Sequence, residues 1–344
     1  MRTLIENYQN SPGEHCGSVA MRSLLRHYCG LELPEPAVFG LGSGLTTGYL
    51  CMPGASPALM VFGRTGTLEA DVAVALGADY VEQREPDDEK AWRDVREEVQ
   101  AGRPTMLSGD ILYLDYREYK VHFPGHRFVL LGFDDEKQAA YIADRINEEP
   151  EVCSYGALAK SRNPPEGLST QNLWGRFRGG ELKHDLQHAT RSAVETCTRR
   201  MLNRDEVPMG SLRGDGDVSF TLGLAGTRLF AEQVRAWGER DDAAELASFN
   251  AACLEKFGNG GGNFRRLYAG FLEWAHALDP VLVPAEAAGL CWRSADTWTR
   301  IAHLLWSVAD GASPWDEAAK HAGEIAQLEQ ELFERLENSL AAAS

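Results

Sequence analysis

The stretch of sequence that decides the fold is residues 126–144, which read HRFVLLGFDDEKQAAYIAD. Two apolar runs, 127–133 and 139–143, are separated by the polar residues 134–138, and this pattern is typical of a β-hairpin. A further strand is expected directly upstream, over 105–112 (TMLSGDIL). Because these strands follow a series of helices, the sequence predicts an α+β fold. It does not predict the alternating order of a doubly wound parallel sheet.

Three helices are expected before these strands. The first begins near Cys16 and is capped by Gly30, and the other two cover 68–76, ended by Gly77, and about 89–100. The apolar face of the first helix consists of residues with helical spacing: Met21, Leu24, Leu25 and Tyr28.

A glycine-rich stretch, GLGSGLTTG, occupies residues 40–48. It lacks the Gly-Lys-Ser/Thr sequence of a phosphate-binding loop. We expect a flexible loop that covers a site, and we assign substrate contacts to Gly42 and Gly44 within it and to Tyr49 directly after it.

Residues 161–185 change character and are expected to form a linker. They contain the segments RNPPEG (162–167) and RFRGG (176–180), which are rich in proline, glycine and arginine. The chain is therefore expected to consist of a catalytic domain over 1–160 and a mainly α-helical domain over 186–344.

The composition excludes several classes of function. The 344 residues carry 34 Lys and Arg against 51 Asp and Glu, a net charge of −17, which argues against a nucleic-acid partner. No apolar run is long enough for a membrane helix, and the start has no apolar signal segment, so we expect a cytoplasmic protein without a membrane partner. The seven cysteines form no CxxC pair, which disfavours structural zinc and a disulfide framework. The oligomeric state is not indicated.

Cys16 is the candidate nucleophile, because the unpaired N–H groups at a helix start stabilise a thiolate. His126 is the candidate base and Asp144 the residue that orients it. If the hairpin turn centres on Asp135, residues whose numbers sum to 270 face each other, which makes His126 and Asp144 cross-strand neighbours. An Asp beside a His fixes its tautomer and supports its charged form.

Further residues are expected to hold the substrate. Asn10 lies six residues before Cys16, and its amide is predicted to point at the oxyanion that forms when the cysteine is acylated. Asp110 is predicted to hold an amine. Tyr113 begins an aromatic segment, 113–119, that is expected to shield the acyl-enzyme from water.

Several blocks of the sequence resemble a known family. The segment EHCGSVA (14–20) resembles the nucleophile helix of papain-like enzymes, particularly bacteriocin-processing peptidases, which have Gln where this chain has Asn10. The closer resemblance is to the butirosin biosynthesis protein H family, through the blocks EHCGSVA, VFGLGSGLTTGY, GRPTMLSGDILYLDY, GHRFVLLGFD and YIADR. The remainder, with GNGGGNFRRLYAGFLEWA, is similar to the domain of unknown function that commonly follows.

This resemblance implies a papain-like fold for the first domain and an acyltransferase activity. It implies Cys16 as nucleophile, His126 as base and then acid, and Asp144 as orienter. The acyl group would come from the phosphopantetheine thioester of an acyl carrier protein and pass to a small-molecule amine, with no bound cofactor and no metal. A hydrolase of the same fold, and a catalytically silent protein that only binds a carrier protein or peptide, are the alternatives.

An acidic carrier protein would need a local basic patch on this acidic chain. Arg191, Arg199, Arg200 and Arg204 supply one if they share a face. A solvated helix surface is the alternative interpretation of these arginines.

Overall fold

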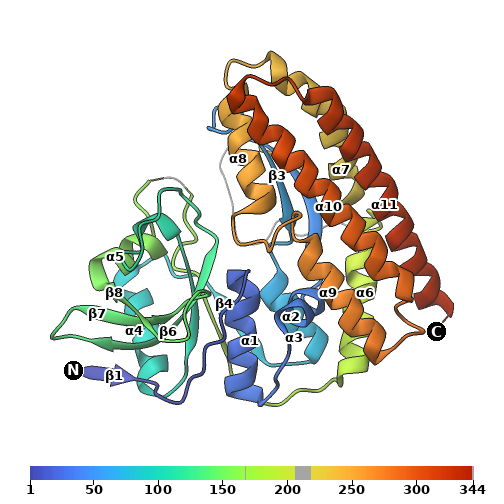
Figure 1. Cartoon of the computed structure of the whole chain (residues 1–344). Coiled ribbons are helices and arrows are strands. Elements are labelled where there is room, and N and C mark those ends of the chain that lie inside the picture. The colour runs from blue at the N-terminus through green and yellow to red at the C-terminus, as the bar shows by residue number, and fades with distance from the viewer. Residues whose placement is uncertain (167, 206–217, 343–344) are drawn as a thin grey trace. The chain divides into compact units, whose positions relative to one another are not determined.

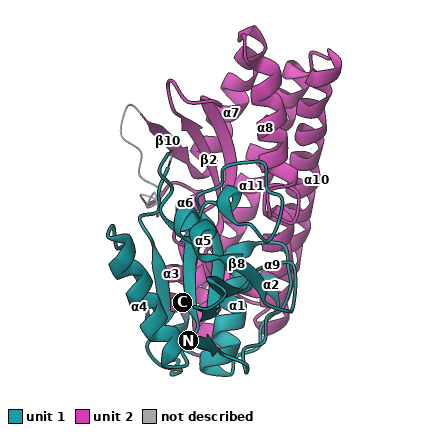
Figure 2. Cartoon of the chain, turned by 90° about the vertical axis from the view of Figure 1, so that its left-hand side faces the viewer, with its two compact units in different colours: residues 1–35, 76–184, 210–213 teal, residues 36–75, 185–209, 214–344 magenta. Residues whose placement is uncertain are grey.

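The computed structural model describes residues 1–166, 168–205 and 218–342, and these residues divide into two compact units. Unit 1 contains Met1–Glu35 and Leu76–His184, and unit 2 contains Pro36–Ala75 and the described residues from Asp185 onward (Figure 2). The two units are described separately.

Unit 1 is built on an antiparallel sheet with the strand order β4-β9-β5-β6-β7-β8, and a further strand, β1, pairs with β6. Figure 1 shows β6, β7 and β8 side by side, with α4 and α5 nearby. Every strand pair in the described residues is antiparallel. This agrees with the prediction that the fold is not a doubly wound parallel sheet. The strands are β1 (Arg2–Leu4), β4 (Tyr80–Gln83), β5 (Thr105–Gly109), β6 (His126–Asp134), β7 (Ala139–Ala143), β8 (Glu151–Ser154) and β9 (Trp174–Phe177).

The core of unit 1 lies between this sheet and the helices α4 (Asp88–Gln100) and α5 (Tyr155–Arg162). Phe128 and Leu130 of β6 pack there with Val95 of α4. Because side chains alternate along a strand, Val129 points to the opposite face, where it is also buried. Helix α1 (Cys16–Cys29) packs against β6 and places its Tyr28 ring 5.4 Å from the ring of Phe177 in β9.

Local sequence explains both ends of α1. The Nδ1 atom of His15 accepts a hydrogen bond from the Ser18 backbone N–H at 3.2 Å and so caps the first turn. At the other end Gly30 adopts a left-handed φ of 63°, which a glycine tolerates without strain, and its N–H donates to the Arg26 carbonyl. The predicted start at Cys16 and the predicted cap at Gly30 are both confirmed.

The hairpin of β6 and β7 is confirmed, but its predicted register is wrong. Facing residues sum to 273 near the turn, as in Asp134↔Ala139, because the turn is centred between residues 136 and 137 and not on Asp135. A bulge between Leu130 and Gly132 then changes this sum to 272, as in Val129↔Ala143. The residue that faces Asp144 in this register is therefore Phe128, and His126 contacts Asp144 from farther along the strand.

The expected order of helices first and strands later is wrong in the first 83 residues, where four short strands occur. The predicted flexible loop over 40–48 is also wrong, because these residues are the end of α2 (Glu35–Leu41) and most of β2 (Leu45–Cys51). They belong to unit 2, and the glycines allow close packing. A Cβ atom on Gly42 would lie 2.7 Å from the Leu68 carbonyl oxygen, and one on Gly44 equally close to the Phe39 carbonyl oxygen.

The compact units also differ from the domains expected from the sequence. The region 161–185, expected to be a linker, contains the strand β9, which pairs with β4 and β5 inside the sheet of unit 1. Four residues are too few for strand alternation to show in the sequence. Residues 36–75, expected in the first domain, lie in unit 2.

Unit 2 is mainly helical, as predicted for the C-terminal half, and some of its helices pack against a small antiparallel sheet of order β10-β2-β3. Its core joins Tyr49 of β2 and Val61 of β3 to Phe230, Trp298 and Ile325 of three helices. The elements are α2, β2, β3 (Leu59–Arg64), α3 (Leu68–Leu76, whose last residue is in unit 1), α6 (Leu186–Met201), β10 (Ser219–Leu222), α7 (Gly223–Gln233), α8 (Ala243–Glu255), α9 (Arg265–Leu278), α10 (Ala285–Ser307) and α11 (Trp315–Ala342).

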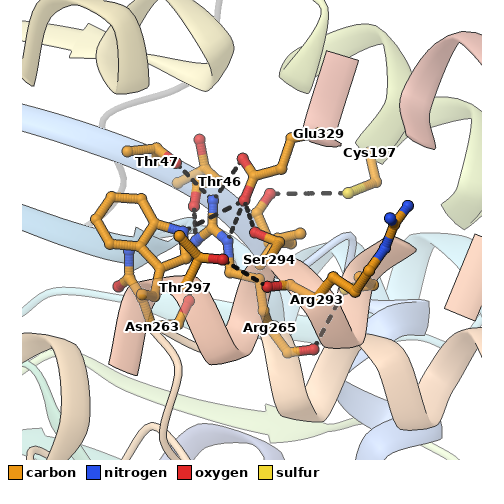
Figure 3. Close-up of polar contacts among 12 residues, drawn as sticks. Thr46, Thr47, Cys197, Asn263, Arg265, Arg293, Ser294, Thr297 and Glu329 are labelled. Atoms are coloured by element: carbon orange, nitrogen blue, oxygen red, sulfur yellow. Dashed lines mark hydrogen bonds and ion pairs between the residues drawn. The ribbon is translucent and has the colours of Figure 1, made fainter. Parts of the chain in front are cut away.

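A fully buried ion pair joins the long helices of unit 2 (Figure 3). Arg265 of α9 donates from Nε and Nη2 to the two carboxylate oxygens of Glu329 in α11, at 2.7 and 3.0 Å. Ser294 of α10 donates to the same carboxylate at 2.6 Å, and Arg265 also donates to the Thr47 hydroxyl of β2 at 2.6 Å. These bonds replace the water that both charges lose on burial.

None of the helices in the described residues is long and apolar enough to cross a membrane. Likewise, across residues 1–166, 168–205 and 218–342, no three His, Cys, Asp or Glu side chains are grouped so that they could hold a metal ion.

The buried ion pair of Arg265 and Glu329 leads to a prediction about stability. Glu329→Gln removes the charge that compensates Arg265 and is expected to lower the free energy of unfolding of unit 2 by about 3–5 kcal/mol. Chemical denaturation followed by tryptophan fluorescence measures this, since six of the eight tryptophans lie in unit 2 (Trp237, Trp274, Trp292, Trp298, Trp306 and Trp315).

The matched control is Glu331→Gln on the same helix. Glu331 pairs with Arg335 at the surface, at 2.8 Å with both side chains about half exposed, so its loss should cost about 0.5 kcal/mol or less. Equal effects of the two substitutions would contradict the structural role assigned to the buried pair.

Candidate active site

The candidate nucleophile Cys16 is the first residue of α1, and only 7% of it is exposed. The first intrahelical bond is donated by the Val19 N–H to the His15 carbonyl, and the His15 side chain caps Ser18. The N–H groups of Cys16 and Gly17 therefore lie before the first intrahelical bond, at the positive end of the helix dipole. No acidic residue lies in this first turn, so a negative charge on sulfur meets no like charge within it.

His126 and Asp144 meet as a buried pair. The Nε2 atom of His126 lies 3.1 Å from both carboxylate oxygens of Asp144, and both residues are almost fully buried. His126 also forms a side-chain hydrogen bond with Cys16. Because Nε2 is directed at Asp144, the other ring nitrogen, Nδ1, is the one available to the sulfur.

Two further groups hold the Asp144 carboxylate. The Tyr116 hydroxyl donates to Oδ2 at 2.8 Å, and the Arg145 backbone N–H donates to Oδ1 at 2.7 Å. With the His126 contact, the carboxylate accepts from three directions, which compensates for its removal from water.

The contact between His126 and Asp144 favours a protonated imidazole and an ionised carboxylate. Burial lowers the pKa of His126, but the charge of Asp144, its hydrogen bond and the hydrogen bond to Cys16 raise this pKa by more, and the net shift is upward. Burial raises the pKa of Asp144, but the charge of His126 and the hydrogen bonds to the carboxylate lower it by more, and the net shift is downward. Burial and the charge of Asp144 raise the pKa of Tyr116, which therefore stays a donor. The arrangement favours an imidazolium beside the sulfur at neutral pH.

Asn10 does not have the geometry predicted for an oxyanion donor. Its Nδ2 atom donates to the carbonyl oxygens of Asp144 at 2.6 Å and Asn147 at 2.7 Å, so both amide hydrogens are used. The Gly13 N–H similarly donates to the Arg145 carbonyl at 2.8 Å. These bonds fasten the segment before Cys16 to the segment that begins with Asp144.

The loop 110–125 joins the ends of β5 and β6, at the pair Gly109↔His126. Asp110, predicted to hold an amine, instead has its carboxylate engaged in this loop. It accepts from the Leu112 and Phe123 backbone N–H groups at 3.1 and 2.9 Å and contacts His122 Nδ1 at 2.7 Å.

Tyr113 lies in the same loop, its ring edge-on to His122 with the centroids 6.0 Å apart. Tyr116, also of this loop, reaches Asp144. By contrast, Gly42, Gly44 and Tyr49 belong to the interior of unit 2, and the Tyr49 hydroxyl accepts from Trp237 at 3.2 Å. Packing within unit 2 thus accounts for these three residues, and their contact with substrate stays a prediction.

The other thiols in the described residues are free, and most lie in environments that favour the protonated form. Burial raises the pKa of five of them: Cys29, Cys153, Cys197, Cys253 and Cys291. Cys16 differs from these five in that its side chain forms a hydrogen bond with His126, which is paired with Asp144.

The arginines expected to form a basic patch are largely neutralised. Arg199 pairs with Asp205 at 2.6 Å, Arg200 pairs with Asp71, and Arg204 lies 3.4 Å from Glu337. These pairs of Arg199, Arg200 and Arg204 favour the alternative interpretation, a solvated helix surface.

Sequence reasoning missed two residues of the site, Tyr116 and Glu35. Tyr116 was visible only as part of an aromatic segment. Glu35 accepts hydrogen bonds from the backbone N–H groups of Glu14 and His15. Neither contact follows a helical or strand period, so no pattern in the sequence indicates it.

The fold and the site define a mixed α/β protein with antiparallel sheets and a buried Cys–His–Asp arrangement at a helix start. Residues 15–145 match the family model described as butirosin biosynthesis protein H, N-terminal, and residues 157–336 match a domain of unknown function, DUF4872. The chain belongs to the family that combines these two domains, which confirms the resemblance inferred from its sequence. None of the curated proteins matches this chain.

Asp144→Asn tests the electrostatics of the site. It removes the charge that raises the pKa of His126, so alkylation of Cys16 by iodoacetamide at pH 7 should slow strongly. The matched control is Tyr116→Phe, which removes one hydrogen bond and keeps the charge, and it should slow alkylation much less. Peptide mass spectrometry gives the rate at each cysteine. An unchanged rate in Asp144→Asn, or faster labelling of Cys51 than of Cys16 in the wild type, would contradict this assignment.

The same substitution should change the pH dependence of stability. A raised pKa of His126 in the folded state stabilises the fold fully below the unfolded pKa of about 6.5, and this contribution is lost as pH rises through the raised value. A lowered pKa of Asp144 stabilises the fold above about pH 3.8 and is lost as pH falls below that. Denaturation of the wild type and Asp144→Asn should therefore differ most between about pH 4 and 6.5, and the difference should shrink as pH rises through the raised pKa of His126.

Proposed function

We propose that the protein is a cysteine-dependent acyltransferase with a papain-like catalytic unit. It would move an acyl group from a thioester to an amine through an acyl-Cys16 intermediate. The observation that carries this proposal is the hydrogen-bonded series Cys16–His126–Asp144, buried at the N-terminus of α1. Family membership supports a role in the biosynthesis of specialised metabolites, because the matching family description names butirosin biosynthesis.

In the first half-reaction, the Cys16 thiolate attacks the thioester carbonyl. The tetrahedral intermediate carries an oxyanion, for which the N–H groups of Cys16 and Gly17 are the proposed donors in place of Asn10. The bond from carbon to the donor sulfur then breaks. The departing thiolate takes the proton of the His126 imidazolium, which leaves acyl-Cys16 and a neutral imidazole.

In the second half-reaction, a neutral amine attacks acyl-Cys16. His126 accepts a proton from the attacking nitrogen, and Cys16 departs as a thiolate. The thiolate–imidazolium pair is thereby restored. Asp144 stays ionised throughout and keeps Nε2 of His126 directed toward itself, so that Nδ1 faces the reaction.

The choice of an amine over water requires a bound acceptor. Water is at roughly 55 M, and an oriented amine can reach an effective molarity of about 10⁵ M or more. The loop 110–125, which is tied to the site by Tyr116, is the proposed wall of the acceptor pocket. We propose a phosphopantetheine thioester of an acyl carrier protein as donor and a small-molecule amine as acceptor. No bound cofactor enters these steps.

Intact-protein mass spectrometry tests the proposal. The protein is incubated with acylated carrier proteins or acyl-pantetheine, and then with candidate amines. We expect an acyl adduct on Cys16 that disappears as an amide is formed, and no adduct in Cys16→Ala. His126→Gln should form the adduct at least 10²-fold more slowly, because general acid–base catalysis contributes about this much. An adduct that yields only free acid with every amine would favour the hydrolase, and the absence of any adduct would contradict the proposal.

A further inference from the structure

A buried carboxylate binds the backbone just before the candidate nucleophile. Glu35, at the start of α2, is the last residue of unit 1 in this part of the chain, and only 7% of it is exposed. Its Oε1 atom accepts from the His15 backbone N–H at 2.7 Å, and both of its oxygens accept from the Glu14 N–H, at 3.1 and 3.0 Å. Glu35 thus holds the backbone N–H groups of the two residues that precede Cys16.

The burial of this carboxylate is costly. Burial raises the pKa of Glu35, and the two backbone hydrogen bonds and the charge of Arg22 offset only part of that effect. Because removing a charge from water costs free energy, the burial of Glu35 is weak evidence that it serves only to stabilise the fold.

The surrounding chain is shaped to admit the carboxylate. A Cβ atom on Gly13 would lie 2.2 Å from Glu35 Oε2 and 2.8 Å from a Val19 methyl group, so only glycine leaves the necessary space. Arg22 of α1 donates to the carbonyl oxygens of Ser11 and Pro12 and holds the same segment from the helix side. Every peptide from Ser11 to His15 is therefore fixed by a side chain or by the Gly13–Arg145 bond.

We infer that Glu35 is a positioning residue for the Cys16 nucleophile: its carboxylate fixes the Glu14 and His15 amides and so aims the first turn of α1 at His126. The inference rests on the proposed role of Cys16. Without the carboxylate, the buried His15 N–H and the partly buried Glu14 N–H lose their acceptor, and the segment must move to find another. A displacement of about 1 Å at a reacting group can cost about 10²-fold in rate.

Alkylation of Cys16 by iodoacetamide tests this inference, because it reads the nucleophile without needing the natural substrates. Glu35→Leu removes both acceptor oxygens and keeps a similar size, and Glu35→Asp keeps the charge and shortens the reach. The matched control is Glu14→Gln, which removes an exposed carboxylate beside the same helix start and leaves Glu35 in place. Gly13→Ala is a second route to the same effect, since it displaces the Glu35 carboxylate without removing it.

The rate constant for Cys16 is measured across pH 5–9 on folded protein, well below each variant's melting temperature. We expect both Glu35 variants and Gly13→Ala to react on the order of 10²-fold more slowly than the wild type at pH 7. Glu14→Gln should react at close to the wild-type rate. In the slow variants the rate should rise with pH as for an ordinary thiol of pKa about 8.5.

Each contrary outcome has a distinct meaning. A lower melting temperature with an unchanged rate and pH profile would reduce Glu35 to a structural residue and overturn the inference alone. An equal loss in Glu14→Gln would assign the effect to charge near the helix and would also overturn it. No selective alkylation of Cys16 in the wild type would overturn both the proposed function and this inference.

Discussion

The buried negative charge of Asp144 is the constraint on which the site depends. A carboxylate removed from water must be compensated, and here an imidazole, a phenol and a backbone N–H surround it. Each of these donors belongs to a different segment: His126 begins β6, Tyr116 lies in the loop before it, and Arg145 follows β7. The contacts of this one carboxylate therefore join the hairpin to the loop 110–125, and its charge raises the pKa of His126.

The nucleophile is joined to this charge through backbone contacts. Asn10 and Gly13 bond to the carbonyl groups of Asp144 and Arg145, so the segment that leads into α1 moves with the segment that carries the carboxylate. Glu35 fixes the next two peptides. The relative placement of sulfur, imidazole and carboxylate thus results from a chain of short hydrogen bonds within unit 1.

Sequence reasoning succeeded where a local rule governs the structure. The start of α1 and its glycine cap follow from capping chemistry, and the hairpin follows from its two apolar runs. The His126–Asp144 contact was predicted from a register that a late turn and a bulge near Leu131 make wrong, so the expectation succeeded because both residues stand at the open end of the hairpin. The glycines at 40–48 were misread because dense packing and flexibility both favour glycine. The roles of Asn10 and Glu35 depend on partners far along the chain, and no periodicity reveals them.

The central claim is that His126 carries a proton beside Cys16 at neutral pH. Nitrogen-15 NMR of the imidazole groups measures this directly, in the wild type and in a His126→Gln variant that identifies the signal. The account predicts that both nitrogens of His126 are protonated at pH 7, and that its titration lies above the value of about 6.5 of a free histidine. A neutral His126 imidazole at pH 7, with an ordinary or lowered pKa, would contradict the account.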